Sequence, residues 1–189
     1  MRWTSTAVLR TVNTEDLAAG ATVHLDGVTG SGMRAIYVQT GNTILGTFRV
    51  TDSKFTTSEL AVSVDAIGAT GVVDFARSTI TTTSQYGVKV TADLPAGGAL
   101  RLTDTTITAA TTGVSFASIG GEFSATDCVI TGGTGTGISV SGDVSATSAV
   151  TLTDVAATGS PSAAYALHLQ TLTGATVRIH RGAFSAYQA

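Results

Sequence analysis

Apolar and polar residues alternate in short stretches that recur along the chain at an interval of about 25 residues. Glycine, serine, threonine and aspartate separate these stretches, which is typical of strands joined by tight turns. The interval is too short for a propeller blade, and no amphipathic helix lies between the strands. The repeating units start at Thr22, Thr47, Val72, Ala99, Glu122, Ala149 and Thr176, with spacings of 25, 25, 27, 23, 27 and 27. The pattern predicts a β-solenoid of about seven stacked turns.

Three sets of apolar positions recur in these units and predict three inward-facing ladders. The first strand supplies Val23/Leu25, Phe48/Val50, Val73/Phe75, Leu100/Leu102, Phe123/Ala125, Val150/Leu152 and Val177/Ile179. A single apolar position follows at Phe55, Ile80, Ile107, Ile130, Ala157 and Phe184. A third pair comes later, at Ile36/Val38, Val62/Val64, Val88/Val90, Val114/Phe116, Ile138/Val140 and Leu167/Leu169. Because alternate residues of a strand point to one side, turns stacked about 4.8 Å apart merge these rows into one core.

The turn after the first strand has a column of its own. It contains Gly27, Asp52, Arg77, Asp104, Asp127, Asp154 and Arg181. Glycine and aspartate accept a left-handed backbone, so the column predicts a sharp corner between two sheets. Arg77 and Arg181 suit such a corner less well, and the pattern leaves the register open at both. A calcium ladder is the alternative interpretation of the aspartates, but the G-G-x-G-x-D pattern is absent and corner residues are favoured.

The repeated unit T-D-x-x-I-T followed by G-V/I-x-V, as in residues 103–108 and 113–116, resembles the right-handed parallel β-helix family. This pectate-lyase-like architecture is shared by polysaccharide lyases, phage tailspikes and bacterial adhesins, and the resemblance covers about residues 21–185. It implies an all-β fold, a right-handed single-stranded parallel β-helix of about seven coils. We assign residues 21–189 to it. Residues 1–20 are a cap or a partial coil, with 14–20 as a short helical turn in the first case.

Composition narrows the function classes. The chain has 189 residues, 43% hydrophobic and only 12% charged, which indicates one packed domain with a surface rich in serine and threonine. A formal net charge of -3 without a basic block argues against a nucleic-acid partner. We find no export signal and no apolar run of about 18 residues that would span a membrane. Cys128, the single cysteine, excludes an internal disulfide and a multi-cysteine metal cage, and we expect a small buried thiol.

Enzymes of the resembled family usually work on the sheet formed by the third pairs, so its outward residues are the candidates for a site. A hydrolase needs two or three carboxylates there, and a lyase needs calcium carboxylates with a basic residue. The binding residues that we select on this face are Tyr37, Asp65, Lys89 and His168. Asp65 and Lys89 fall in neighbouring coils as an exposed ion pair, whereas His168 lies about 14 Å further along. We therefore predict no catalytic residue, no metal and no cofactor.

Threonines form a second outward pattern. Thr56, Thr81, Thr108, Thr131 and Thr158 hold one position in five successive units. Such ranks resemble those of ice-binding solenoids, but threonine also suits any exposed strand, and Arg49, Asp74, Arg101 and Arg178 interrupt the neighbouring face. We keep ice binding as a minor alternative.

The sequence thus favours a non-catalytic structural or adhesive β-helix. We expect a phage tail or spike component, another virion-associated part, or a bacterial surface stalk. The last coil stops before its third pair, so a homotrimer or another partner chain should cover it, and a polysaccharide or cell-surface glycan is the expected ligand. Absence of a visible signal favours a virion part over a cell-surface one, with the cytoplasm as the remaining location. The alternative is a carbohydrate-active enzyme with a sparse or inter-subunit site.

Overall fold

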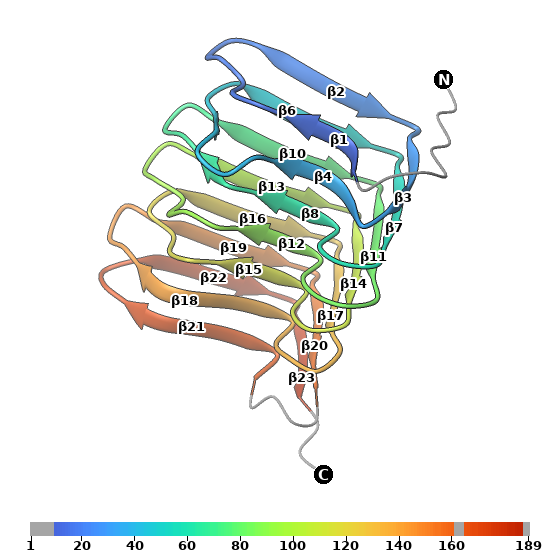
Figure 1. Ribbon diagram of the computed structural model, residues 1–189. Coiled ribbons are helices and arrows are strands. Elements are labelled where there is room, and N and C mark those ends of the chain that lie inside the picture. Colours follow the sequence, from blue (N-terminus) through green and yellow to red (C-terminus); the bar gives the residue numbers. More distant parts are fainter. Residues whose placement is uncertain (1–9, 161–164, 187–189) are drawn as a thin grey trace.

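Three parallel sheets build the protein, as its computed structural model shows for residues 10–160 and 165–186 (Figure 1). Sheet 1 contains β1 (Arg10–Thr14), β4 (Arg34–Val38), β8 (Val62–Val64), β12 (Val88–Val90), β15 (Val114–Phe116), β18 (Ile138–Val144) and β21 (Leu167–Leu172). Sheet 2 contains β2 (Thr22–Asp26), β6 (Thr47–Thr51), β10 (Val72–Ala76), β13 (Ala99–Thr103), β16 (Glu122–Thr126), β19 (Ala149–Thr153) and β22 (Thr176–His180). Sheet 3 contains β3 (Thr29–Gly32), β7 (Lys54–Thr57), β11 (Thr79–Thr82), β14 (Thr106–Ala109), β17 (Val129–Gly132), β20 (Ala156–Gly159) and β23 (Ala183–Ala186). The described residues contain no helix.

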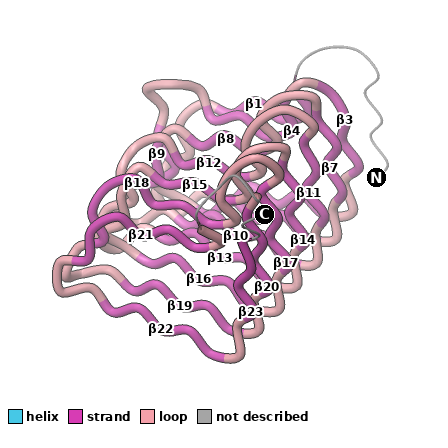
Figure 2. The backbone as a smooth tube through the Cα atoms, turned by 90° about the horizontal axis from the view of Figure 1, so that it is seen from below, coloured by secondary structure: helices cyan, strands magenta, loops and turns pink. Residues whose placement is uncertain are grey.

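Each turn of the chain adds one strand to every sheet, so the fold is a parallel β-solenoid of seven turns. Sheets 2 and 3 form two rows of strands that meet along one edge of the molecule (Figure 2). Within a sheet, equivalent residues pair directly: Val73 lies beside Phe48 in one direction and Leu100 in the other. The unit starts expected from the pattern coincide with the first residues of all seven sheet 2 strands. The predicted fold class and period are confirmed.

The three predicted ladders form the core in the five inner turns. Phe48, Phe75, Phe116 and Phe123 are each at most 1% exposed, and the valines and isoleucines of the same columns are equally buried. The ring centroids of Phe116 and Phe123 lie 4.8 Å apart, which joins sheet 1 to sheet 2. Side-chain alternation on stacked strands therefore accounts for the continuous core.

A fourth ladder fills the corner between sheets 1 and 2 and was not predicted. The short strands β5 (Thr43–Ile44) and β9 (Ala66–Ile67) pair there, and isolated bridges continue the column. Its members are Leu17, Ile44, Ile67, Leu94, Ile119 and Val144, all buried. Each turn supplies only one apolar residue to this corner, so the sequence shows no alternation that would reveal a strand.

The predicted corner column between sheets 2 and 3 has left-handed backbone at every position. The φ angles are 62° at Gly27, 51° at Asp52, 48° at Arg77, 47° at Asp104, 54° at Asp127, 53° at Asp154 and 51° at Arg181. Arg77 and Arg181 therefore keep the register that the pattern left open. A left-handed conformation is costly for a residue with a long side chain, and each arginine pairs with the aspartate of the preceding turn.

Small polar side chains form hydrogen bonds within and between turns on the inner side of this corner. Ser53 Oγ donates to Thr51 O at 2.7 Å and accepts from Val28 N of the preceding turn at 3.0 Å. Cys128 holds the equivalent place, where its Sγ donates to Thr126 O at 3.2 Å and burial raises the pKa of the thiol. The expectation of a buried cysteine is confirmed: its thiol substitutes for a corner hydroxyl.

The described parts of the first and last turns are both built of strands. No helix forms over residues 14–20: Leu17 bridges Ile44 instead, and Gly20 turns the chain with φ at 78°. β1 precedes β2 and supplies the sheet 1 strand of the first turn, so both end turns contain three strands, β1–β3 and β21–β23 (Figure 1). Counted from β1, the described strands make seven three-stranded turns, whereas the repeating unit that starts at Thr176 contains β22 and β23 and, within the described residues, no sheet 1 strand after them. Residues 1–9 of the predicted cap segment lie outside the described residues.

Candidate functional site

The outward face of sheet 1 carries the residues selected from the sequence. Strand pairing places Tyr37, Ser63 and Lys89 in one row, which continues through Ser115 and Ser139 to His168. Two turns separate Tyr37 from Lys89 and three separate Lys89 from His168, or about 10 Å and 14 Å along the stack. The structure spreads the predicted residues along the sheet and does not bring them together.

Each selected residue has a neighbour of its own. Lys89 Nζ lies 4.9 Å from the ring centroid of Tyr86, and Arg34 Cζ lies 4.6 Å from that of Tyr37. The rings of His168 and Tyr165 stack with centroids 5.1 Å apart. Two of these contacts are cation–π pairs and the third is a stacked pair of rings, so each of these selected side chains already has a partner on the sheet.

The Asp65 carboxylate binds a backbone amide. Its Oδ2 accepts a hydrogen bond of 2.6 Å from the amide of Gly41 in the preceding turn, and Asp16 holds Thr43 N in the same way at 2.7 Å. Among the described residues no ion pair joins Asp65 to Lys89, so the expected pair is not formed. Asp65 orders the loop that leads into the corner between sheets 1 and 2.

A hollow of about 350 Å³ lies on the same face and is lined by Tyr86, Lys89, Ser115, Ser139 and Ser141, among others. Its lining offers hydroxyl groups and one ammonium group, but no carboxylate. Glycoside hydrolysis needs paired carboxyl groups, and a hydroxyl nucleophile needs an adjacent base. The hollow suits contact with a polar ligand, and its lining has no acid–base pair.

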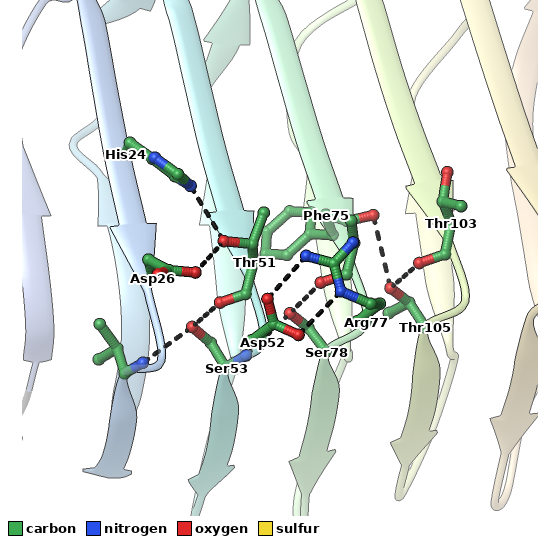
Figure 3. Close-up of polar contacts among 12 residues, drawn as sticks. His24, Asp26, Thr51, Asp52, Ser53, Phe75, Arg77, Ser78, Thr103 and Thr105 are labelled. Atoms are coloured by element: carbon green, nitrogen blue, oxygen red, sulfur yellow. Dashed lines mark hydrogen bonds and ion pairs between the residues drawn. The ribbon is translucent and has the colours of Figure 1, made fainter.

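A second surface, on the outward side of sheet 2 and the turns that follow its strands, groups several charged side chains and was missed from the sequence (part of it is drawn in Figure 3). We call it the charged corner, a hollow of about 570 Å³ lined by His24, Asp26, Arg49, Thr51, Asp52, Asp74, Ala76, Arg77 and Thr103. Strands β2, β6 and β10 position these side chains, because outward residues of successive turns stand side by side. The sequence does contain a signal for this surface: two pairs of oppositely charged residues stand 25 positions apart, which is one turn of the solenoid. They are Arg49 with Asp74, and Asp52 with Arg77.

Ion pairs neutralise most of the charged corner. Arg77 donates to Asp52 from Nε at 2.8 Å and from Nη2 at 2.7 Å, and Arg49 Nε donates to Asp74 at 3.0 Å. The hydrogen bonds from Arg77 lower the pKa of Asp52. Arg101 and Arg181 lower the pKa of Glu122 and Asp154 in the same way further along the stack. A general acid needs a raised carboxyl pKa, so these shifts run in the wrong direction for one.

Thr51 lies between a histidine and an aspartate, which invites comparison with a catalytic triad. Its hydroxyl donates to Asp26, while His24 Nε2 lies 2.9 Å from the same oxygen (Figure 3). Since the hydroxyl has one proton and gives it to Asp26, His24 must donate to Thr51. A triad requires the reverse, with the histidine accepting the hydroxyl proton and the aspartate bonded to the histidine. The arrangement is a structural hydrogen-bond chain.

Comparison with known proteins adds no identification. No family model, no curated protein and no solved structure matches this chain. Within the described ranges, no cluster of three potential metal ligands is present, and no helix is long and apolar enough to cross a membrane. The two surfaces on sheets 1 and 2 are therefore the candidates for interaction.

Proposed function

We propose that this chain is a non-catalytic structural or adhesive solenoid, serving as a phage tail or spike component, another virion-associated part, or a bacterial surface stalk. The observation that carries the proposal is the contrast between its inside and its outside. An apolar core runs through every inner turn, whereas on the outer face of sheet 2 and its corner column four ion pairs join charged side chains of neighbouring turns. In such a molecule the apolar and the paired charged residues both stabilise the stacking of one turn on the next.

The chemistry of the two hollows supports the same proposal. The sheet 1 hollow has no carboxylate in its lining, and in the charged corner Asp52 and Asp74 are paired with arginines. Proton transfer at a glycosidic bond needs one carboxyl group that holds its proton near neutral pH. The lowered pKa of Asp52 favours a permanently charged, structural carboxylate.

The finer assignment is part of the proposal. Three parallel sheets and a left-handed corner column are features shared with the right-handed, pectate-lyase-like and tailspike-like β-helices. We propose membership of that group, a homotrimer or a partner that covers the last turn, and a polysaccharide or surface glycan as ligand. A virion or a cell surface is the proposed location. Tyr37, Lys89 and His168 are partly exposed and lie on the outward row that would contact such a ligand.

A depolymerisation screen coupled to light scattering tests the proposal. The purified chain is incubated with neutral and acidic polysaccharides, and release of new reducing or unsaturated ends is followed while its mass is measured. An inactive oligomer is the expected result, whereas cleavage by a monomer would contradict the proposal. Cleavage by an oligomer that is lost in Asp65→Asn, with Asp93→Asn as the matched control, would favour the alternative of a carbohydrate-active enzyme with an inter-subunit site.

Ice binding remains the minor alternative, because one row of hydroxyl groups runs along all of sheet 3. Ser31, Thr56, Thr81, Thr108, Thr131, Thr158 and Ser185 stand in register. The neighbouring row contains Lys54 and Val129, which break a second rank. Thermal hysteresis would support this alternative, and freezing at the buffer value would exclude it.

A further inference from the structure

The two ends of the solenoid present corresponding strands of the same three sheets. The first turn ends on β1, β2 and β3, and the last turn on β21, β22 and β23, at opposite ends of the stack (Figure 1). Strand pairing assigns Leu25 and Ile179 to one column of sheet 2 and Gly30 and Phe184 to one column of sheet 3. Among the described strands, each end turn has one edge that faces no neighbour. The two edges are opposite sides of the same ladders.

The last turn exposes apolar side chains at positions that are buried in the inner turns. Ile179 is 50% exposed, whereas Val50, Phe75 and Leu102 of the same column are at most 1% exposed. Leu172 is 55% exposed at the position where Val144 is fully buried. An open strand edge that carries exposed apolar residues is a template for pairing with another chain.

We propose that a second copy of this chain covers the last turn, head to tail, so that β21, β22 and β23 of one copy pair with β1, β2 and β3 of the next. Continuing the register of each column across this junction places Ile179 beside Leu25, Phe184 beside Gly30 and His180 beside Asp26. The same inward ladders then run through both copies.

The sizes of the side chains fit at this junction. Within the chain, Phe55 lies beside Gly30 and Phe184 lies beside Ala157, so each phenylalanine of this column stands next to a small residue. Phe184 of one copy beside Gly30 of the next repeats that arrangement. Two large rings are never placed in adjacent turns of the column, so the junction needs no repacking of the core.

One polar pair also fits at this junction. His180 and Asp26 are both exposed, and stacking brings the imidazole beside the carboxylate, whose Oδ1 already accepts the Thr51 hydroxyl. Arg181 would lie beside Gly27, and its guanidinium already pairs with Asp154 of its own copy. Arg178 would lie beside His24, which already has Arg49 as its neighbour within the chain, so this position adds no opposite charge. The apolar columns and the His180–Asp26 neighbours therefore set this register.

A head-to-tail contact is heterologous and does not close, so it produces linear chains of copies. This distinguishes it from a closed trimer formed through the sides of the solenoid. The inference rests on the proposed function in one respect, since it names the partner that covers the last turn, but an isolated solenoid could still serve as a scaffold.

Sedimentation velocity of the 189-residue chain over a wide concentration range tests the junction. We expect species larger than the 18.9 kDa monomer that grow with concentration. Ile179→Lys should reduce them to monomer, because the ammonium group would be buried at the junction. Val129→Lys is the matched control: Val129 is 49% exposed on the side of sheet 3, and its substitution should leave assembly unchanged.

Mixing two blocked variants provides a sharper test. Leu25→Lys blocks the first turn and Ile179→Lys blocks the last turn, so each variant alone should be monomeric. An equimolar mixture retains one intact junction and should form heterodimers that grow no further. Circular dichroism melting confirms that both variants are folded. A wild type that stays monomeric at all concentrations, assembly unaffected by Ile179→Lys, or a mixture of folded variants that stays monomeric would overturn the junction and leave the scaffold proposal standing.

Discussion

Arg77 reaches back across one turn of the solenoid and holds the carboxylate of Asp52 with two hydrogen bonds of 2.8 Å and 2.7 Å. Both residues occupy the same corner column, and both have left-handed backbone. Arg181 and Asp154 repeat this relationship four turns later. The column thus combines a conformational requirement within each turn with an ionic contact between turns, and both contribute to its register.

The Asp52 contact predicts a pH-dependent stability. Arg77 lowers the pKa of Asp52, so the folded carboxylate stays charged at a pH where the unfolded chain already binds a proton. Its contribution is present above the ordinary aspartate pKa and is lost as the pH falls through the lowered folded value. Asp52→Asn should therefore lower Tm at neutral pH, and the difference from wild type should vanish in acid. Added salt should shrink the difference.

Asp127→Asn is the control for that measurement, since Asp127 lies two turns from Arg181 and both amide side chains suit a left-handed backbone. Asp127 takes part in none of the described ion pairs, so its difference from wild type should change less with added salt. Equal salt dependence for the two variants would show that the arginine contact does not stabilise the fold.

The left-handed corner itself is tested at Asp127, where φ is 54°. Asp127→Val should destabilise the protein by about 1–2 kcal/mol, because a β-branched residue clashes in this region. Asp127→Gly should be neutral or stabilising, since glycine adopts the conformation freely. Urea denaturation measures both free energies of unfolding. A valine variant as stable as the glycine variant would argue against the left-handed conformation.

Phenylalanines at inner and end turns should differ in their contribution to stability. Phe55 is fully buried, and Phe55→Ala should cost about 3–5 kcal/mol through lost burial and the cavity left behind. Phe184 occupies the same column in the last turn and is only half-buried, so Phe184→Ala should cost clearly less in the monomer. Chemical denaturation at low protein concentration makes the comparison, and equal losses would contradict the open last turn.

Cys128 should tolerate serine. Ser53 and Ser78 occupy the equivalent position in other turns and donate to the same type of carbonyl, so Cys128→Ser should keep the corner hydrogen bond to Thr126. Its Tm should stay close to that of wild type. Because Cys128 is buried and its thiol pKa is raised, the native thiol should react slowly with a disulfide reagent and rapidly after unfolding. Fast labelling of the native protein would contradict the burial.

Much of the fold could be predicted from the sequence because its repeats are strict. Two alternating apolar residues and a turn residue recur in all seven units, a further apolar residue follows in six of them, and stacking leaves such a pattern few other solutions. The corner ladder through Ile44 and Leu94 could not be predicted, because it takes only one apolar residue from each turn and so shows no alternation of apolar and polar residues. β1 falls in the segment that the sequence left open as a cap or a partial coil, because the repeats could be aligned only from Thr22 onward. The right-handed sense of the winding stays a prediction.

The surface was harder to predict. The family resemblance points to sheet 1, whereas the ion pairs of Arg49 with Asp74 and of Arg77 with Asp52 lie on sheet 2 and in the turns that follow its strands. Those pairs are visible in the sequence only after the turns are aligned, since their partners lie 25 residues apart. Asp65 looked like a functional carboxylate, but its bond to the Gly41 amide is a backbone contact that no side-chain pattern reveals.

Native-state hydrogen exchange is the measurement that tests the scaffold most directly. A continuous core with open ends predicts the strongest amide protection in β6, β10, β13, β16 and β19, exchanging together through global unfolding, and the weakest in β22 and β23. At monomer concentrations this gradient from centre to end should be visible in every sheet. Uniformly fast exchange across the inner turns, or protection that peaks in β22, would contradict the account.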